Sequence, residues 1–162
     1  MIIHLLGENP KSIAEMVRKL EGLENILAVE IGLPLECDST MLRGFIDAAL
    51  GELPTVISLE YGHLPEMLET LVELQPAAVH LRTPRGTLPD AKDNLASGRL
   101  YGPAMFPLAL NAIQRLTSSG LRIIAGGGVF SHAGVQAILN LEVFAVSLDA
   151  VLWQCNAYKV FD

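Results

Sequence analysis

Residues 98–116 read GRLYGPAMFPLALNAIQRL, and residues 121–153 read LRIIAGGGVFSHAGVQAILNLEVFAVSLDAVLW. In this stretch, a loop leads into an amphipathic helix. An apolar strand then runs into Gly126-Gly127-Gly128, before a second helix and a final strand. Glycines between a strand and a helix expose backbone N–H groups at a helix N-terminus, which suits an anion such as phosphate. Glycine-rich turns also serve close packing alone, so both interpretations stay open.

The same alternation extends upstream to the first residues. Short apolar runs bounded by glycine or proline predict strands, and apolar residues three or four positions apart predict helices. The expected strands are Ile2–Leu6, Ile26–Ile31, Thr55–Leu59, Ala77–Leu81, Leu121–Ala125 and Phe144–Leu148. The expected helices are Pro10–Leu20, Met41–Leu50, Pro65–Leu74, Pro103–Thr117, His132–Leu139 and Val151–Tyr158, and a long polar loop is expected over Thr83–Gly102.

These βα repeats predict an α/β fold with a parallel sheet and right-handed crossovers. An open Rossmann-like sheet and a partial, six-stranded TIM barrel both fit the pattern. Each of these folds places its site at the carboxyl ends of the strands. No linker or change of composition interrupts residues 1–162, so a single domain is expected.

Composition excludes several classes of protein. The net charge of -7 argues against nucleic acid or an anionic membrane surface as the main partner. The two cysteines, Cys37 and Cys155, lie far apart, which favours free thiols in a reducing compartment. The chain shows neither a signal-peptide pattern nor the ~20 apolar residues of a membrane span, so a cytoplasmic location is expected.

The carboxyl half resembles the dihydroorotate dehydrogenase family of FMN-dependent (β/α)8 barrels. Residues 98–104, GRLYGPA, match the family's G-G-L-S-G-P-A segment, and residues 123–129, IIAGGGV, match its I-I-G-V-G-G-I strand. Weaker matches are residues 28–34, AVEIGLP, for E-L-N-I-S-C-P, and residues 79–83, VHLRT, for a strand ending in N-T. The resemblance implies a barrel in which the glycine segment holds the phosphate of FMN.

Under this resemblance the chain begins at the family's third strand. The first two βα units, which carry flavin and substrate contacts, then have no counterpart. Six strands do not close an eight-stranded barrel with ordinary tilt and shear, so two sheet edges stay open. We therefore expect a homo-oligomer, or a partner chain that supplies the missing units.

The resemblance also implies that the family's chemistry is absent. Leu33 stands where the family has a Cys or Ser base, and Cys37 lies four residues further on. Ser58 stands where a Lys contacts the flavin. Leu148-Asp149 replaces the Gly-Thr pair that completes the phosphate site, and the carboxylate of Asp149 would repel a phosphate.

The same alignment predicts a remodelled polar interior. Because strand side chains alternate between faces, His4, Glu30, Ser58 and Arg82 should point inward at the carboxyl ends of neighbouring strands. In one interpretation Arg82 binds a carboxylate or phosphate while Glu30 or His4 moves protons. In the other, Glu30 and Arg82 form an internal ion pair and His4 fills space. His80 should share this face, as a packing residue.

The candidate catalytic residues are therefore His4, Glu30 and Arg82, and the candidate cofactor-binding residues are Gly126, Gly127, Gly128, Ser131 and Gly102. Ser131 suits either a phosphate or the N-cap of the following helix. Arg85 and Arg99 flank the long loop, where they could close over an anion or remain exposed loop residues. No His, Cys, Asp or Glu spacing indicates a metal site.

Three functions remain open at this point. The first is a catalytically degenerate relative of dihydroorotate dehydrogenase that binds a phosphate or the phosphate of FMN. The second is an active FMN-dependent oxidoreductase that another subunit completes. The third is a non-catalytic assembly module, because open sheet edges are association surfaces. Tyr158, Val160 and Phe161 at the tail could cover one such edge.

Overall fold

The computed structural model of the chain describes residues 1–153. Six parallel strands form one sheet in the order β1-β2-β3-β4-β7-β8. The strands are β1 (Ile2–Leu6), β2 (Ala28–Gly32), β3 (Thr55–Glu60), β4 (Ala78–Arg82), β7 (Ile123–Gly126) and β8 (Ala145–Ser147). The α-helices are α1 (Pro10–Leu20), α2 (Ser39–Ala48), α3 (Leu64–Leu74), α4 (Phe106–Thr117) and α5 (His132–Leu139). The predicted α/β fold with a six-stranded parallel sheet is confirmed.

The described chain divides into two compact units. The first contains Met1–Leu59, His63–His80 and Ser119–Arg122, and the second contains Glu60–Gly62, Leu81–Ser118 and the described residues from Ile123 onward. Strands β3 and β4 contribute residues to both units. The sequence-based expectation of a single domain stays a prediction.

In the first unit, local sequence signals set the helix starts. The Asn9 side chain accepts a hydrogen bond from the Ser12 N–H, and Pro10 opens α1. The Asp38 side chain accepts a hydrogen bond from the Met41 N–H at 2.7 Å and so caps α2. Each cap satisfies a backbone donor that has no partner within its helix.

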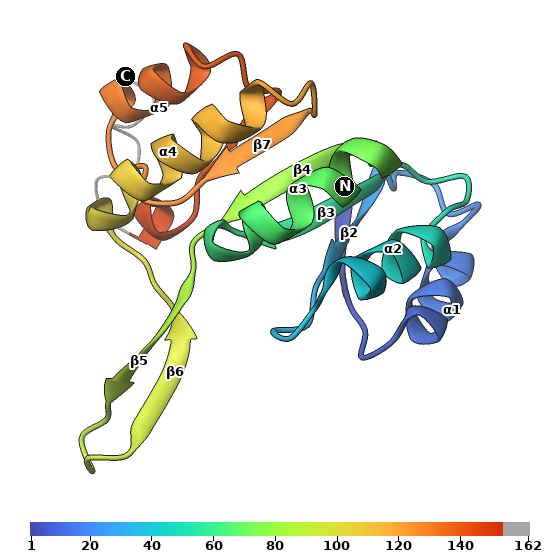
Figure 1. Cartoon of the computed structure of the whole chain (residues 1–162), viewed down its shortest axis with the longest axis horizontal. Helices are drawn as coiled ribbons and strands as arrows, with labels where there is room; N and C mark the ends of the chain where they lie inside the picture. Colours follow the sequence, from blue (N-terminus) through green and yellow to red (C-terminus); the bar gives the residue numbers. More distant parts are fainter. Residues whose placement is uncertain (154–162) are drawn as a thin grey trace. The chain divides into compact units, whose positions relative to one another are not determined.

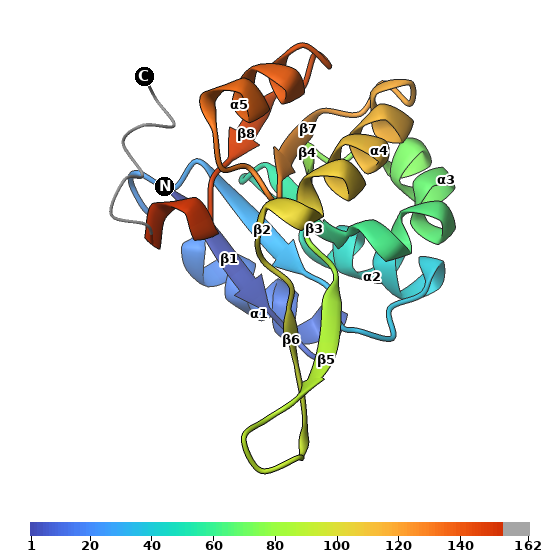
Figure 2. The same cartoon turned by 90° about the vertical axis from the view of Figure 1, so that its left-hand side faces the viewer.

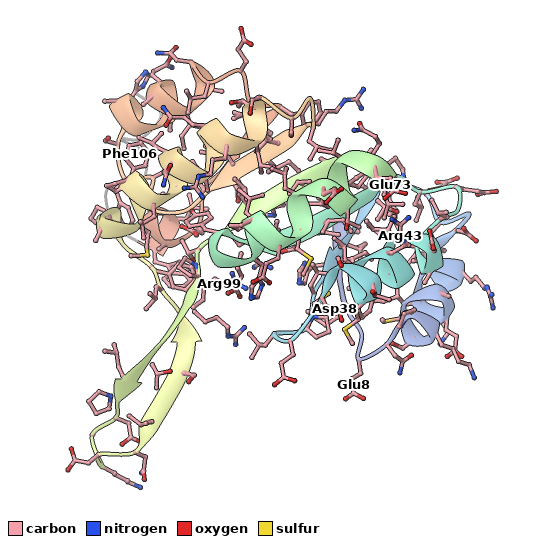
Figure 3. The ribbon with its side chains drawn as sticks, in the orientation of Figure 1. Glu8, Asp38, Arg43, Glu73, Arg99 and Phe106 are labelled. Carbon is pink, nitrogen blue, oxygen red and sulfur yellow. The ribbon has the colours of Figure 1, made fainter. Side chains whose placement is uncertain are left out.

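The core of the first unit lies between its strands and its three α-helices. α1 packs against α2, and α2 packs against α3. The fully buried side chains include Ile13, Ile31, Leu42, Phe45, Ile57, Met67 and Leu71. Arg43 of α2 and Glu73 of α3 also form an exposed ion pair (Figure 3). Exposed pairs contribute little to stability, so burial of the apolar side chains holds this unit together.

In the second unit, two α-helices cover the final pair of strands. β7 pairs with β8 in parallel, α4 packs against β7 and α5, and α5 packs against β8. The buried side chains include Leu81, Ala109, Ile113, Leu116, Ala125 and Ile138. A 3₁₀-helix, η2 (Pro103–Met105), leads directly into α4.

The predicted polar loop over Thr83–Gly102 is wrong in its central part, where the chain forms a β-hairpin. Strands β5 (Arg85–Pro89) and β6 (Leu95–Arg99) pair antiparallel, and the hairpin extends away from α4 and α5 (Figures 1 and 2). Its turn is held by the Asp90 side chain, which accepts hydrogen bonds from the N–H groups of Lys92 and Asn94. Both faces of the hairpin are largely exposed, so the segment lacks the alternation that predicts a strand.

Most other predicted boundaries differ from the observed ones by one or two residues. The predicted helix over Val151–Tyr158 is represented by a 3₁₀-helix, η3 (Ala150–Trp153), and its remainder lies outside the described residues. Cys155 and the tail residues Tyr158, Val160 and Phe161 also lie outside them. None of the helices within residues 1–153 has the length and apolar character of a membrane-spanning segment.

We expect Phe45→Ala to lower the free energy of unfolding by about 3–5 kcal/mol, because Phe45 is fully buried between α2 and its neighbours. Urea unfolding followed by circular dichroism measures this change. The control is Leu50→Ala in the same unit, where the side chain is 70% exposed and the expected change is below about 0.5 kcal/mol. Similar losses for both variants would contradict the assigned core.

Candidate functional site

A carboxylate–imidazole cluster of His4, Glu30 and His80 lies on the strands of the first unit. His4 of β1 and Glu30 of β2 are direct partners in the parallel register. The Nδ1 atoms of His4 and His80 each lie 3.1 Å from the same Glu30 oxygen, Oε1. The Glu30 side chain is 13% exposed, so this carboxylate is nearly enclosed. The structure thus brings together two of the three predicted catalytic residues and adds His80.

The two imidazoles hold Glu30 in its charged form. Burial alone would raise the pKa of Glu30, but hydrogen bonds from His4 and His80, with the positive charge of those rings, hold it well below its ordinary value. Since an ionised carboxylate only accepts hydrogen bonds, each Nδ1 carries the proton and donates it.

This cluster has two chemical interpretations. Oriented imidazoles beside a carboxylate can move protons, and a buried carboxylate can equally be a charge that two imidazoles compensate. Arg82, the third predicted catalytic residue, ends β4 and is half-buried. Its expected ion pair with Glu30 stays a prediction.

In the glycine turn, Gly126–Gly128, the last two residues pack too closely for any larger residue. A β-carbon on Gly127 would overlap the hydroxyl of Tyr61 and the methyl group of Thr83. A β-carbon on Gly128 would lie 2.4 Å from the backbone nitrogen of Phe106 at the start of α4. Gly127 and Gly128 also have φ angles of +103° and +73°, which favour glycine. Close packing therefore accounts for these glycines, and the predicted phosphate binding stays a prediction.

Tyr61 fixes the glycine turn from the side of β3. Its hydroxyl donates a hydrogen bond to the carbonyl oxygen of Gly126. Burial raises the pKa of Tyr61 above its ordinary value, and the Asp149 carboxylate adds to the rise against the opposing charge of Arg99. The phenol therefore stays protonated at neutral pH and remains a hydrogen-bond donor.

A cavity of about 300 Å³ lies between the glycine turn and the start of α5. Its lining residues are Pro103, Phe106, Gly128, Phe130, Ser131, Ala133 and Gly134. The Ser131 Oγ accepts a hydrogen bond from the Gly134 N–H at 3.1 Å, so Ser131 is the N-cap of α5. Gly102, with a φ angle of +123°, is the N-cap residue of η2. Both residues thus have structural roles, and their predicted cofactor contacts stay predictions.

A second polar site lies in the second unit, at the root of the hairpin. This hairpin root is formed by Glu60, Thr83, Arg85 and Arg99. Arg99 ends β6 and lies where the hairpin joins β4 (Figure 3). Its Nη1 donates a hydrogen bond to the Thr83 carbonyl oxygen at 2.8 Å, and its Nη2 lies 3.7 Å from Glu60 Oε1. The Arg85 backbone N–H donates to the other Glu60 oxygen, Oε2, at 3.3 Å.

Positive charge accumulates at the hairpin root. Burial lowers the pKa of Arg99, and the neighbouring guanidinium groups of Arg82 and Arg85 lower it further, against Glu60 and Tyr101, which raise it. Arg99 remains charged, because an Arg pKa starts far above neutral pH. A guanidinium under this repulsion favours a nearby anion.

Cys37, the nearest thiol to the family's base position, does not replace that base. It is buried, and burial, reinforced by the Asp38 carboxylate, raises its pKa to about 11. The thiol is therefore protonated at neutral pH and is not a proton acceptor. Within residues 1–153, no group of three or more His, Cys, Asp or Glu side chains could hold a metal ion.

Sequence reasoning missed the roles of His80, Glu60, Thr83 and Tyr61. The inward face predicted for His80 did place it near Glu30, but the pattern gave no sign of its hydrogen bond. Glu60 and Tyr61 directly follow an expected strand, and this position at the carboxyl end of a parallel strand was the available signal.

The fold is similar to that of DHODH from Eimeria tenella. The ligand-free crystal structure matches with a TM-score of 0.73 at 13% identity, over 92% of this chain and 52% of that chain. The complex with ferulenol matches with a TM-score of 0.72 at 13% identity, over 93% of this chain and 52% of that chain. The chain thus spans about half the length of these proteins. At this identity the similarity shows the fold alone.

No protein-family model matches the sequence, and no curated protein matches it. The resemblance seen in the sequence is therefore supported at the level of the fold, as half of a DHODH barrel.

The charge of Glu30 should make stability depend on pH. Its folded-state pKa lies below the unfolded value of about 4.3, so its contribution is present above that pH and is lost as the pH falls further. Glu30→Gln should lower the free energy of unfolding at pH 7 by about 1–3 kcal/mol, because the imidazoles of His4 and His80 lose the charged, nearly enclosed acceptor that they share.

Urea unfolding of both proteins between neutral and acidic pH tests this expectation. The difference between wild type and Glu30→Gln should shrink below about pH 4.3. Glu69→Gln, at an exposed position on α3, is the control and should behave as wild type throughout. A difference that grows on acidification would contradict the assignment.

Proposed function

We propose that this chain is a dihydroorotate dehydrogenase-like domain that binds a phosphate-bearing ligand and does not carry out the family's redox reaction. The observation that carries the proposal is the cavity of about 300 Å³ beside the glycine turn. This volume is at the lower end of the ~300–1,000 Å³ of small-molecule sites. The first turn of α5 offers backbone N–H groups to a phosphoryl group. Phe106 and Phe130 offer apolar surface to the rest of a ligand.

The proposal is limited to phosphate binding, because the residues present do not fit the redox half of FMN. Flavin, when bound, supplies hydride transfer, which needs a base beside the substrate and a cation beside the reduced ring. Leu33 and Ser58 stand at the two family positions that supply them. The Cys37 thiol, with its pKa of about 11, does not replace the base. No catalytic step is therefore assigned to a flavin.

Purified protein mixed with FMN and then desalted should show no flavin bands in its visible absorption spectrum. It should also fail to oxidise dihydroorotate. Retained flavin together with dihydroorotate oxidation would contradict the proposal. That outcome would favour the alternative of an FMN-dependent oxidoreductase, and co-expression with a chain carrying the first two βα units would then test whether another subunit completes it.

A carboxylate introduced into the cavity tests phosphate binding directly. Ala133→Glu adds a negative charge to the cavity lining at the start of α5, a position where such a charge stabilises the helix. The variant should fold, yet bind inorganic phosphate at least about tenfold more weakly by calorimetry, equivalent to ~1.4 kcal/mol. Gln136→Glu is exposed on the same helix and should bind phosphate as wild type. Equal affinities for both variants would contradict the site.

A second candidate function is assembly, which the ends of the sheet order favour. β1 and β8 each have a neighbouring strand on one side in that order. Ile2 and Leu6 of β1 and Phe144 before β8 are exposed, and Leu6 is 71% exposed. β1 carries no lysine, proline or bulge of the kind that protects an edge strand from pairing. The partner would be a second copy of the chain or a chain that supplies the missing βα units.

Sedimentation velocity at micromolar concentration tests the homo-oligomeric form of this candidate. Wild type should sediment as an oligomer, and Leu6→Lys should shift it toward the monomer, because a charged side chain at a sheet edge opposes pairing. Leu50→Lys places the same charge at another exposed position of the first unit and should leave the oligomer unchanged. A monomeric wild type would exclude the homo-oligomer.

A further inference from the structure

The hairpin root holds a guanidinium group whose donors are mostly unused. Only Nη1 of Arg99 donates a hydrogen bond within the described residues, to the Thr83 carbonyl oxygen. The Nη2 atom lies 3.7 Å from Glu60 Oε1, which is an ion-pair distance and too long for a hydrogen bond. A guanidinium has five N–H donors in a fixed fork, so Arg99 keeps the geometry that grips an oxyanion in a bidentate way.

A second, independent observation comes from Thr83. The residue is 1% exposed, and its Oγ1 has no hydrogen-bond partner among the described residues. A buried hydroxyl without a partner is unfavourable, and such groups call for an explanation. The Thr83 methyl group faces Gly127, and the Thr83 carbonyl oxygen accepts a hydrogen bond from Arg99. The unpartnered hydroxyl therefore lies on the same residue that positions the Arg99 guanidinium.

Glu60 contacts both Arg85 and Arg99, but its distance from the Arg99 guanidinium leaves that charge only partly compensated. Its Oε2 accepts from the Arg85 backbone N–H, which leaves the Arg85 side chain at the surface. Its Oε1 faces Arg99 across 3.7 Å. Both side chains of the Arg99–Glu60 pair are 18% exposed, so water screens their charges only in part. A ligand oxyanion can approach more closely than Glu60 does, and so bind the same fork.

The geometry points to an oxyanion-binding site at the hairpin root, where Arg99, Arg85 and the Thr83 hydroxyl bind the carboxylate or phosphate group of a small molecule. Arg99 supplies the bidentate contact, Thr83 donates from its hydroxyl, and Arg85 adds charge at the entrance. Glu60 positions Arg99 in the free protein and competes with the ligand for it. This site does not depend on the cavity beside α5, and it stands whether or not that cavity binds phosphate.

Isothermal titration calorimetry at low ionic strength, with inorganic phosphate and with malonate as separate probes, tests the site. Glu60→Gln should tighten binding several-fold, because it removes the competing charge and keeps the shape. Arg99→Lys should weaken binding at least tenfold, since it keeps the charge but loses the fork. A purely structural Arg99–Glu60 pair predicts no gain of affinity in Glu60→Gln. The tighter of the two probes identifies the ligand as phosphate-bearing or carboxylate-bearing.

Matched controls separate this site from the general field of the protein and from the cavity beside α5. Arg115→Gln removes one positive charge from an exposed position on α4 and should leave both affinities within twofold of wild type. A binding event confined to the cavity would respond to Ala133→Glu and stay unchanged in Arg99→Lys, which would overturn the proposal. Failure of wild type to bind either probe would also overturn it.

Two further variants guard against loss of folding. Arg85→Gln changes an exposed side chain, keeps the backbone hydrogen bond to Glu60, and should weaken binding about threefold or more. Thr83→Val replaces the unpartnered hydroxyl by a methyl group of similar shape. It should raise the melting temperature of the free protein and weaken anion binding. A Thr83→Val protein that binds as wild type would show that the hydroxyl makes no contact with the ligand.

Discussion

Close approach of backbone segments at Gly126–Gly128 is the constraint on which the second unit depends. The turn runs against Tyr61 and Thr83 on one side and against the first residue of α4 on the other, with no room for a β-carbon on Gly127 or Gly128. The Tyr61 hydroxyl and the Gly126 carbonyl then satisfy each other inside this contact. Since the glycine turn packs closely against all three, β7, the start of α4 and the residue after β3 are positioned as one group.

The two polar sites solve the problem of buried charge in different ways. At Glu30, two imidazoles converge on one carboxylate oxygen, and the charge is compensated within the cluster. At the hairpin root, the single contact of 3.7 Å between Arg99 and Glu60 leaves compensation incomplete, and a buried hydroxyl remains unpartnered. A charge that is compensated within its own cluster is consistent with a structural role, whereas an unpartnered buried group needs an explanation, for which we propose ligand binding. This contrast places the stronger case for ligand recognition at the hairpin root.

The repeating strands and helices were predictable because both carry regular apolar periodicities. The alternation of faces also placed His4 and Glu30 together, and the observed register confirms that placement. The hairpin was not predictable, since its strands are exposed and a turn built on the Asp90 side chain resembles any polar loop. Without the hairpin, sequence reasoning had no means to bring Arg99 to Glu60. Contacts between residues far apart in sequence depend on which elements pair, and local patterns do not encode that pairing.

Burial of Cys37 has a consequence for the chemical durability of the first unit. Oxidants and alkylating agents react with a cysteine that is exposed and deprotonated to the thiolate. Neither condition is met at Cys37. The residue is buried, and its pKa of about 11 leaves very little thiolate at neutral pH. As long as the first unit is folded, Cys37 is therefore protected from sulfenic acid formation and from mixed disulfides.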